Sequence, residues 1–410
     1  MAQTKKKLLL LYSDLPYPIK QGIDARVVNL LMSFSRRFET HLICKVGSKD
    51  RLQYVPQVEK FCNYIEAFLA PNRISNVHRL AYKIPLFFST LLKGTPRDYF
   101  YNNLSKIKKR ILNLIQNNYY DIIFFEYWFW DKGLIQACKG LKVIDTNDIQ
   151  FQRIFKFRRE EFQAFSNAWM RFQRGRYIKK ECEHLNLFDI IIVTTDKDKK
   201  SLQNCLSSQK EIVVYPTGVD TDYFVPRIVP KEESLIFYGD MSHSINIDGG
   251  LYLYKEIMPL IWNKKKNVKL SIVGNNPPAE IKALDSDHRV TVTGYVKDVR
   301  DYLAMAKVVV LPLRFEFGHR GRIYEVMAMG IPLVVTPQAI KGMGLQNGEG
   351  LLIEDLPVSI TDAVLKIMNN TEYAMELGMK GRKTVCERFN KAATYDRLTG
   401  FLYEYSKRRE

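Results

Sequence analysis

The stretch Arg314-Phe-Glu-Phe-Gly-His-Arg-Gly-Arg-Ile-Tyr-Glu325 is followed at once by Val-Met-Ala-Met-Gly330-Ile-Pro332 and by the apolar run Leu333 to Val335. Glycine and proline after an apolar helical pattern end a helix, and a short apolar run after them is typical of a buried strand. The stretch therefore predicts a loop, a helix and a strand in succession, which is a building unit of an α/β protein.

The loop before this helix has the chemistry of an anion site. A helix start offers unpaired backbone N–H groups and the positive end of the helix dipole, and both attract anions. Arg320 and Arg322 add forked donors that match phosphate oxygens. Glu325 lies one turn further on, where an acidic residue suits the hydroxyls of a ribose. An ordinary amphipathic helix with surface charges is the alternative interpretation.

Apolar segments alternate with helical patterns along the whole chain. In the first half the apolar segments are Lys7 to Tyr12, His41 to Val46, Asp121 to Glu126, Val143 to Asp145 and Phe188 to Thr195. In the second half they are Leu235 to Tyr238, Val268 to Val273, Val290 to Thr293, Val308 to Leu311, Leu333 to Val335 and Leu351 to Ile353. This alternation predicts an α/β fold with parallel sheets covered by helices on both faces. The turn-rich residues Thr217 to Pro230 separate the two series.

Composition excludes several classes of protein. The 410 residues, 46% of them hydrophobic, are enough for two domains with separate cores. No apolar run is long enough for a membrane span, and we expect no signal peptide. The six cysteines lack CxxC spacing and the six histidines are dispersed, which argues against a zinc site and a disulfide framework and fits a reducing cytosol. The net charge of +18 favours anionic partners without choosing among nucleic acid, lipid and phosphorylated substrates.

Several motifs together resemble the GT-B glycosyltransferases of the large group 1, or family 4, type. They are Gly22 in an early loop, Tyr215-Pro-Thr-Gly-Val-Asp220, Phe237-Tyr-Gly-Asp-Met241, Ser271-Ile-Val-Gly274, Val292-Thr-Gly-Tyr-Val296 and the segment from Gly318 to Pro332. The likeness covers nearly the whole chain and is greater in the second half. It implies two Rossmann-like doubly wound domains that face each other across a cleft. Residues 1–215 would bind the acceptor, with the C-terminal helix 390–410 packed back on them, and residues 216–389 would bind the donor.

The resemblance also implies roles for individual residues. Arg320 and Arg322 would hold the diphosphate of a nucleotide sugar, and Glu325 would bind its ribose. Asp148 would orient the acceptor hydroxyl or take its proton, although capping of the next helix is an equal alternative. The other donor-binding positions would be Gly22, Gly239, Gly274, Tyr295, Val296, Gly318, His319 and Ile323. For the glycines that follow strands, relief of crowding in the turn is the alternative role.

The sequence departs from the family pattern at three places. Glu316 lies nine positions before Glu325, whereas the family often has a glutamate eight positions before. The loop from Asp240 to Asn246 lacks the arginine and lysine that many members carry, so Arg320 and Arg322 would supply the positive charge alone. Asn147 stands where a histidine is common.

Two further features allow more than one interpretation. Asp196-Lys-Asp198 and Asp220-Thr-Asp222 have the spacing of a metal-binding pair, but we interpret the first as a helix N-cap and the second as part of a linker. The segment from Phe151 to Lys180 combines an aromatic stripe (Phe151, Phe155, Phe162, Phe165, Trp169 and Phe172) with basic residues. It either packs into the first domain or lies on an anionic membrane surface.

The resemblance predicts a retaining, metal-independent transfer of a hexose-type sugar from a nucleotide sugar to a glycan, glycolipid or lipid-linked acceptor. A protein or small-molecule acceptor is an alternative. An oxidoreductase of the same fold lacks support because no Gly-x-Gly-x-x-Gly follows the first strand, and a nucleic-acid-binding protein lacks a recognisable module. We expect no cofactor, no nucleic acid partner, and a cytoplasmic location with peripheral contact to the inner face of a membrane as an option.

Overall fold

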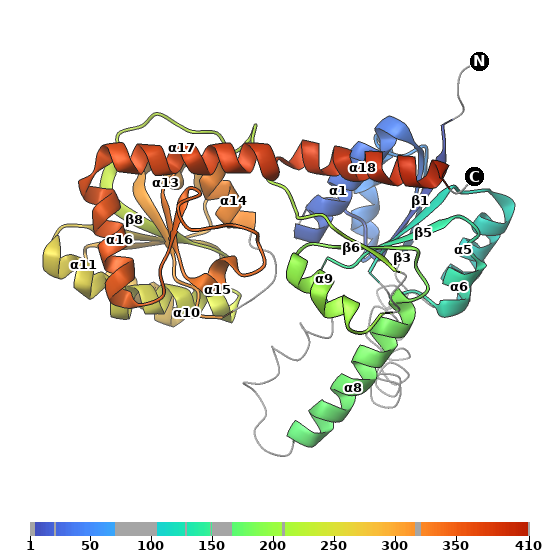
Figure 1. Ribbon diagram of the computed structural model, residues 1–410, viewed down its shortest axis with the longest axis horizontal. Helices are drawn as coiled ribbons and strands as arrows, with labels where there is room; N and C mark the ends of the chain where they lie inside the picture. Colours follow the sequence, from blue (N-terminus) through green and yellow to red (C-terminus); the bar gives the residue numbers. More distant parts are fainter. Residues whose placement is uncertain are drawn as a thin grey trace. The chain divides into compact units, whose positions relative to one another are not determined.

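The computed structural model describes residues 5–19, 22–69, 105–127, 129–147, 149, 166–206, 210–315 and 321–408. Contacts between residues divide the chain into two compact units. Unit 1 comprises residues 1–215 and 395–410, and unit 2 comprises residues 216–394. Each unit is an α/β structure built on a parallel sheet (Figure 1).

Unit 1 has a seven-stranded sheet in its described residues, with strand order β3-β2-β1-β4-β5-β6-β7 and parallel pairing throughout. The chain runs through β1 (Lys7–Tyr12), α1 (Gly22–Arg37), β2 (Glu39–Val46), a 3₁₀ turn (Lys49–Tyr54), α2 (Val55–Glu59), β3 (Tyr64–Leu69), α5 (Ser105–Asn117), β4 (Ile122–Glu126), α6 (Lys132–Ala137), β5 (Leu141–Asp145), α8 (Ser166–Leu185), β6 (Ile190–Val193), α9 (Asp196–Gln203) and β7 (Glu211–Val214). The last helix, α18 (Lys391–Lys407), belongs to unit 1 from Tyr395 onward.

Unit 2 has a six-stranded parallel sheet in its described residues, with strand order β10-β9-β8-β11-β12-β13. Its elements are β8 (Glu232–Tyr238), α10 (Ser244–Tyr252), a π-helical turn (Leu253–Ile257), α11 (Met258–Lys264), β9 (Lys269–Val273), α12 (Ala279–Lys282), a 3₁₀ turn (Ala283–Ser286), β10 (Val290–Gly294), α13 (Val299–Met305), β11 (Ala306–Leu311), α14 (Gly321–Ala328), β12 (Leu333–Val335), α15 (Pro337–Ile340), β13 (Leu351–Ile353), α16 (Pro357–Asn369) and α17 (Thr371–Arg388).

Both sheets have a point at which the strand order reverses. In unit 1 this switch point lies between β1 and β4, and in unit 2 it lies between β8 and β11. In open α/β sheets, ligands bind outside the carboxyl ends of the strands at such a point. The fold therefore marks one candidate ligand-binding edge in each unit.

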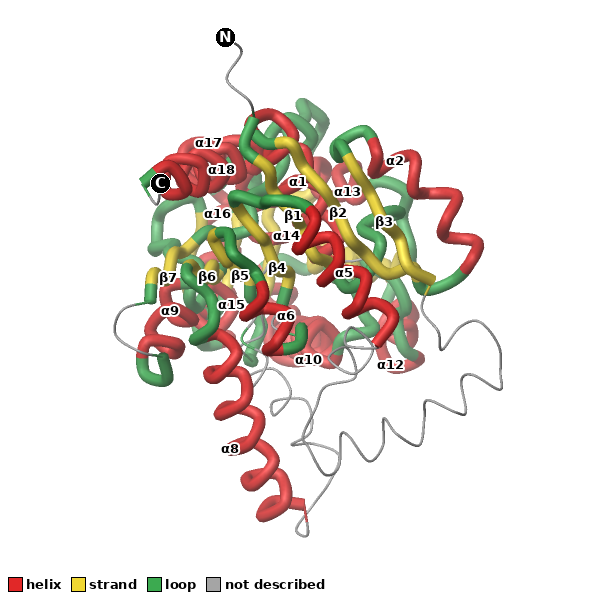
Figure 2. The backbone as a smooth tube through the Cα atoms, turned by 90° about the vertical axis from the view of Figure 1, so that its right-hand side faces the viewer, coloured by secondary structure: helices red, strands yellow, loops and turns green. Residues whose placement is uncertain are grey.

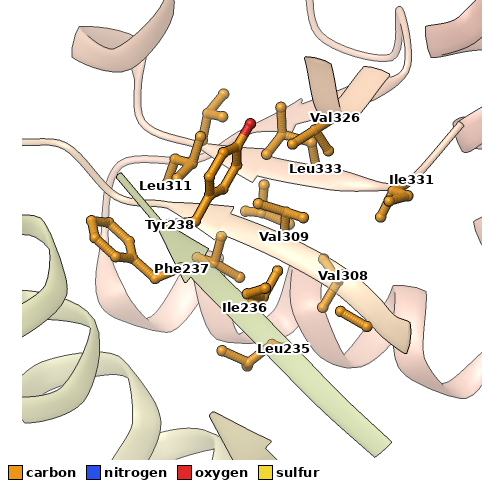
Figure 3. Packing of buried hydrophobic residues seen from close by; sticks show 14 of the residues in the cluster. Leu235, Ile236, Phe237, Tyr238, Val308, Val309, Leu311, Val326, Ile331 and Leu333 are labelled. Atoms are coloured by element: carbon orange, nitrogen blue, oxygen red, sulfur yellow. The ribbon is translucent and has the colours of Figure 1, made fainter. Parts of the chain in front are cut away.

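The core of unit 2 explains why its strands are so apolar. Figure 3 shows Leu235, Ile236 and Phe237 of β8 beside Val308 and Val309 of β11, and each of these side chains is at most 1% exposed. A parallel sheet covered on both faces buries successive side chains in both directions, so its strands are continuous apolar runs. Gly330, two residues after the end of α14, has a φ of +66°, the left-handed conformation that often follows the last turn of a helix.

Helix α8 extends away from the sheet of unit 1 (Figures 1 and 2). The aromatic stripe predicted between Phe151 and Phe172 cannot be placed on it, because residues 151–165 and the side chains of Trp169 and Phe172 lie outside the described residues. Among the described residues, no helix combines the length and the apolar character that crossing a bilayer requires.

The expectation of unpaired cysteines is wrong for one pair. Cys182 in the last turn of α8 and Cys205 just after α9 form a disulfide, with their Cα atoms 6.0 Å apart. The two residues are 23 positions apart in the sequence. They meet because α8 and α9 pack on the same sheet, and no spacing motif signals such a contact. Cys44, Cys62, Cys138 and Cys386 are free thiols.

Both Asp-x-Asp patterns have local structural roles. Thr195 is the N-cap of α9, where its side chain accepts a hydrogen bond from the backbone N–H of Asp198, so Asp196 lies in the first turn and is not the cap. Asp220 accepts hydrogen bonds from the backbone N–H groups of Asp222 and Tyr223, at 3.2 and 2.9 Å. No cluster of three potential metal-ligating side chains occurs within the described ranges.

Candidate functional site

A cavity of about 480 Å³ opens at the switch point of unit 2. Its walls come from the residues that follow the carboxyl ends of the strands and from the start of α14. The lining residues include Tyr238, Gly239, Asp240, His243, Asn246, Gly274, Asn275, Tyr295, Val296, Leu313, Gly321 and Arg322. The position agrees with the general rule for ligand sites in open α/β sheets.

Backbone hydrogen bonds bring the strand ends together. The N–H of Gly239 donates to the carbonyl of Val273 at 3.0 Å, and the N–H of Gly274 donates to the carbonyl of Gly294 at 3.3 Å. A Cβ on Gly274 would lie 1.8 Å from the carbonyl oxygen of Gly239. A side chain at Gly274 is therefore incompatible with the observed backbone, and close approach of two strand ends is the reason for glycine there.

This close approach gives a prediction about stability. Gly274→Ala should lower the free energy of unfolding by about 1–3 kcal/mol, because the backbone at Gly239 must move to admit the new methyl group. Chemical denaturation of the full chain measures the effect. Gly321→Ala is the matched control, since a Cβ on Gly321 meets no atom within 4 Å. Equal stability of wild type and Gly274→Ala would contradict the packing argument.

Arg322 is the cation that projects from α14 to the cavity. Its Nη1 donates to the carbonyl of Tyr238 and its Nη2 donates to Oδ1 of Asn246, both at 2.7 Å. Asn246 is itself fixed, because its Nδ2 donates to the carbonyl of Asp240 at 2.6 Å. A guanidinium has five N–H donors, so these two bonds orient Arg322 and leave capacity for a ligand.

The environment of Arg322 favours an anion. Burial lowers the pKa of the guanidinium, although the charge of Glu325 acts in the opposite direction. A negatively charged ligand stabilises a partly desolvated cation more than it stabilises a fully hydrated cation. The side chain is thus both positioned and electrostatically suited to hold a phosphate group.

Glu325 is not among the residues that line the cavity. Its Oε2 accepts a hydrogen bond from the Tyr238 hydroxyl at 3.0 Å, and the same hydroxyl is 2.8 Å from the carbonyl of Arg322. Burial raises the pKa of Glu325, while the bond from Tyr238 lowers it. In the described residues, the other carboxylate oxygen has no hydrogen bond and remains available as an acceptor.

The predicted site residues other than Glu325 fall into four groups. Gly239, Gly274, Tyr295, Val296 and Arg322 line the cavity together, and the Tyr295 side chain is 76% exposed. Ile323 does not join them, because its side chain is fully buried in the core of unit 2. Gly22 begins α1 in unit 1 and is exposed. The structure does not describe Arg320, Gly318, His319 or the candidate catalytic residue Asp148.

The sequence prediction missed the polar rim of the cavity. Asp240 and His243 follow β8, Asn246 lies in the first turn of α10, and Asn275 follows β9. Burial would raise the pKa of Asp240, but hydrogen bonds from Ser242 lower it, so the carboxyl keeps its negative charge. Position just after the carboxyl end of a strand was the one sequence signal that could have identified Asp240 and Asn275.

Comparison with known proteins supports the fold. Residues 232–370 match the family model described as glycosyl transferases group 1. No curated protein matches the sequence. The matched range contains every residue that lines the cavity.

Solved structures share the fold over nearly their whole length. Sucrose-phosphate synthase from Thermosynechococcus elongatus has a TM-score of 0.69 at 17% identity, with 99% of this chain and 100% of that chain covered. Anabaena HepE in complex with UDP has a TM-score of 0.65 at 12% identity, with coverage of 97% and 100%. A glycosyltransferase from Rickettsia africae has a TM-score of 0.63 at 12% identity, with coverage of 97% and 98%. The chain therefore has the GT-B fold, and its second unit carries a group 1 glycosyltransferase domain.

Proposed function

We propose that the protein is a retaining glycosyltransferase that moves a hexose-type sugar from a nucleoside diphosphate sugar to an acceptor hydroxyl without a bound metal. The observation that carries the proposal is the oriented guanidinium of Arg322 in a cavity at the switch point of a group 1 domain. Anabaena HepE, which is similar in structure, was solved in complex with UDP, and this supports a nucleotide as a ligand of the cavity.

In this proposal the parts of the cavity have separate tasks. Arg322 and the N–H groups at the start of α14 hold the diphosphate, with Arg320 from the preceding loop as a second cation. The exposed ring of Tyr295 and the backbone at Val296 face the base. Glu325 is bonded to the hydroxyl of the lining residue Tyr238, and its free oxygen is the proposed acceptor of hydrogen bonds from the ribose hydroxyls.

Catalysis then follows from charge stabilisation and positioning. The bond between the anomeric carbon and the diphosphate oxygen breaks, and its electron pair leaves with the diphosphate. The acceptor oxygen forms the new glycosidic bond and its proton is released. A preoriented cation stabilises the charge that develops on the departing group, which is the step where such a residue contributes most.

Glycans, glycolipids and lipid-linked sugars are the proposed acceptors, and contact with an anionic membrane surface from the cytoplasmic side is part of the same proposal. The net charge of +18 supports this contact. Co-sedimentation with vesicles that contain anionic lipid, compared with neutral vesicles, tests it: binding that falls with added salt is expected. Equal pelleting with both kinds of vesicle would contradict it.

A thermal-shift panel tests the donor. The full chain is heated with the diphosphates of uridine, guanosine, adenosine and thymidine and with their glucose, galactose and mannose derivatives. A ligand that binds only the folded state raises the melting temperature, so one nucleoside should give a shift and the others little. The absence of a shift with every compound would contradict the proposed donor.

Transfer itself is measured with the same nucleotide sugars in radiolabelled form and with neutral octyl glycosides as acceptors. A labelled product that depends on both substrates, and that persists in the presence of a metal chelator, is expected. No product with any pair would contradict the proposed function.

A further inference from the structure

The switch point of unit 1 carries a buried polar cluster. Tyr12, Glu126 and Asp145 are the last residues of β1, β4 and β5, three strands that are neighbours in the sheet. Asp145 and Glu126 are fully buried, and Tyr12 is 4% exposed. Because ligands of open α/β sheets bind at such a point, polar residues there are candidates for a site.

The charges within the cluster compensate one another. Nε of Arg26, on α1, donates to Oδ2 of Asp145 at 2.7 Å. Both side chains are at most 1% exposed. The pair therefore brings no net charge to the edge of the sheet, which is then poorly suited to an anionic ligand.

Glu126 has an unsatisfied oxygen. Its Oε1 accepts a hydrogen bond from Nδ2 of Asn147, whereas its buried Oε2 has no partner among the described residues. Burial and the negative charge of Asp145 raise the pKa of Glu126 well above 4.5, and Arg26 and Asn147 oppose the rise. The folded protein therefore keeps the proton on this carboxyl group to a higher pH than an exposed glutamate would.

Asn147 is held at three points. Its backbone N–H donates to Oδ1 of Asp145 at 3.2 Å, its carbonyl accepts from Oγ1 of Thr194 at 2.9 Å, and its side-chain amide donates to Glu126. Its φ is +49°, a left-handed conformation that asparagine adopts more readily than most residues do. The side chain is partly exposed, and its Oδ1 accepts no hydrogen bond from any described residue.

We propose that Asn147, positioned by Glu126 and Asp145, is a residue of unit 1 that binds the acceptor, and that it binds an uncharged hydroxyl group. The inference rests on the proposed function. An amide with one end fixed keeps a carbonyl oxygen and an N–H for a ligand, which matches the acceptor and donor capacity of a sugar hydroxyl. Glu126 is a positioning residue in this arrangement, because it acts through Asn147.

The first test separates acceptor binding from donor binding. Asn147→Gly keeps the left-handed backbone accessible and removes the amide. In the octyl glycoside assay we expect the acceptor KM to rise about 10-fold, the effect of losing about one hydrogen bond, with the donor KM and the nucleotide thermal shift unchanged. Asn118→Ala is the control, since Asn118 bonds to the carbonyl of Leu114 at the end of α5 and lies away from the cluster.

The second test uses the oxygen of Glu126 that accepts the hydrogen bond from Asn147. The charged and titratable described groups that interact with it are Asp145 on β5, Arg26 on α1, Tyr12 on β1 and Tyr395 on α18. Glu126→Gln keeps a side-chain oxygen that accepts the hydrogen bond from Asn147, and it cannot ionise. Glu126→Ala removes this oxygen. The acceptor KM of Glu126→Gln should stay close to that of wild type, because the amide oxygen still accepts the hydrogen bond from Asn147. Glu126→Ala should raise the acceptor KM at every pH.

Stability provides a readout that does not require activity. The folded state holds the Glu126 proton more tightly than the unfolded chain does, so stability is lost as pH rises from about 4.5 towards the raised pKa. This part of the pH dependence of unfolding should be absent in Glu126→Gln.

The outcomes distinguish the two proposals. If wild type transfers sugar and Asn147→Gly has an unchanged acceptor KM, the acceptor assignment is overturned while the proposed function stands. If Glu126→Gln is as impaired as Glu126→Ala, the positioning of Asn147 through the side-chain oxygen at position 126 is overturned. If wild type itself transfers no sugar to any octyl glycoside, both proposals fail together.

Discussion

Replacing Arg322 by alanine is expected to lower kcat/KM for sugar transfer by about 10²- to 10³-fold, the range found when one group that stabilises developing charge is removed. Arg322 is held by the carbonyl of Tyr238 and by Asn246, so it meets the diphosphate without reorganisation. Its loss removes the one arginine or lysine among the described residues that line the cavity. Steady-state kinetics with the preferred donor measure the change.

Arg314→Ala is the matched control. Arg314 lies in the same stretch of sequence and forms an exposed ion pair with Asp248, outside the cavity lining. It should retain wild-type kcat/KM, and circular dichroism should show that both variants are folded. Equal activity of Arg322→Ala and Arg314→Ala would remove Arg322 from the site.

The largest effect on stability is expected at the buried pair in unit 1. Arg26→Met should lower the free energy of unfolding by about 3–5 kcal/mol, because it leaves the carboxylate of Asp145 buried without its counter-charge. The loss also removes the bond from Nη2 of Arg26 to the carbonyl of Tyr215. Denaturant titration at neutral pH measures the difference.

Helix α1 offers its own control. Arg36 on the same helix pairs with Asp396 at 2.7 Å, but the two side chains are 58% and 45% exposed. Arg36→Met should therefore cost less than about 1 kcal/mol. If the two variants lose similar free energy of unfolding, burial of the Arg26–Asp145 pair contributes little to stability, which would contradict this prediction.

The strands could be predicted from the sequence where both faces of the sheet are covered. The predicted bounds of β1 and β12 coincide with the observed ones, because full burial makes each of them a continuous apolar run. Strand β3, Tyr64-Ile-Glu-Ala-Phe-Leu69, was missed. It lies at the edge of the sheet and is only partly buried, so its apolar signal is interrupted by Glu66.

The candidate site could be predicted only in part. Glycines after strands and a basic helix start are local signals, and they identify Gly239, Gly274 and Arg322. Ile323 shows the limit of a motif, since adjacent helical residues are rotated by about 100°, so the side chain next to Arg322 enters the core. The role of Asn246 depends on its hydrogen bond with Arg322, which is 76 residues away in the sequence, and no local pattern reveals it.

Calorimetric titration of the full chain with the four nucleoside diphosphates tests the central claim, a nucleotide site built around Arg322, most directly. The account predicts that one of them binds wild type with a stoichiometry of about one and binds Arg322→Ala at least about 10-fold more weakly, as expected for the loss of a charge-assisted hydrogen bond. Binding of that nucleotide to both proteins with the same affinity, or no binding to wild type by any of the four, would contradict it.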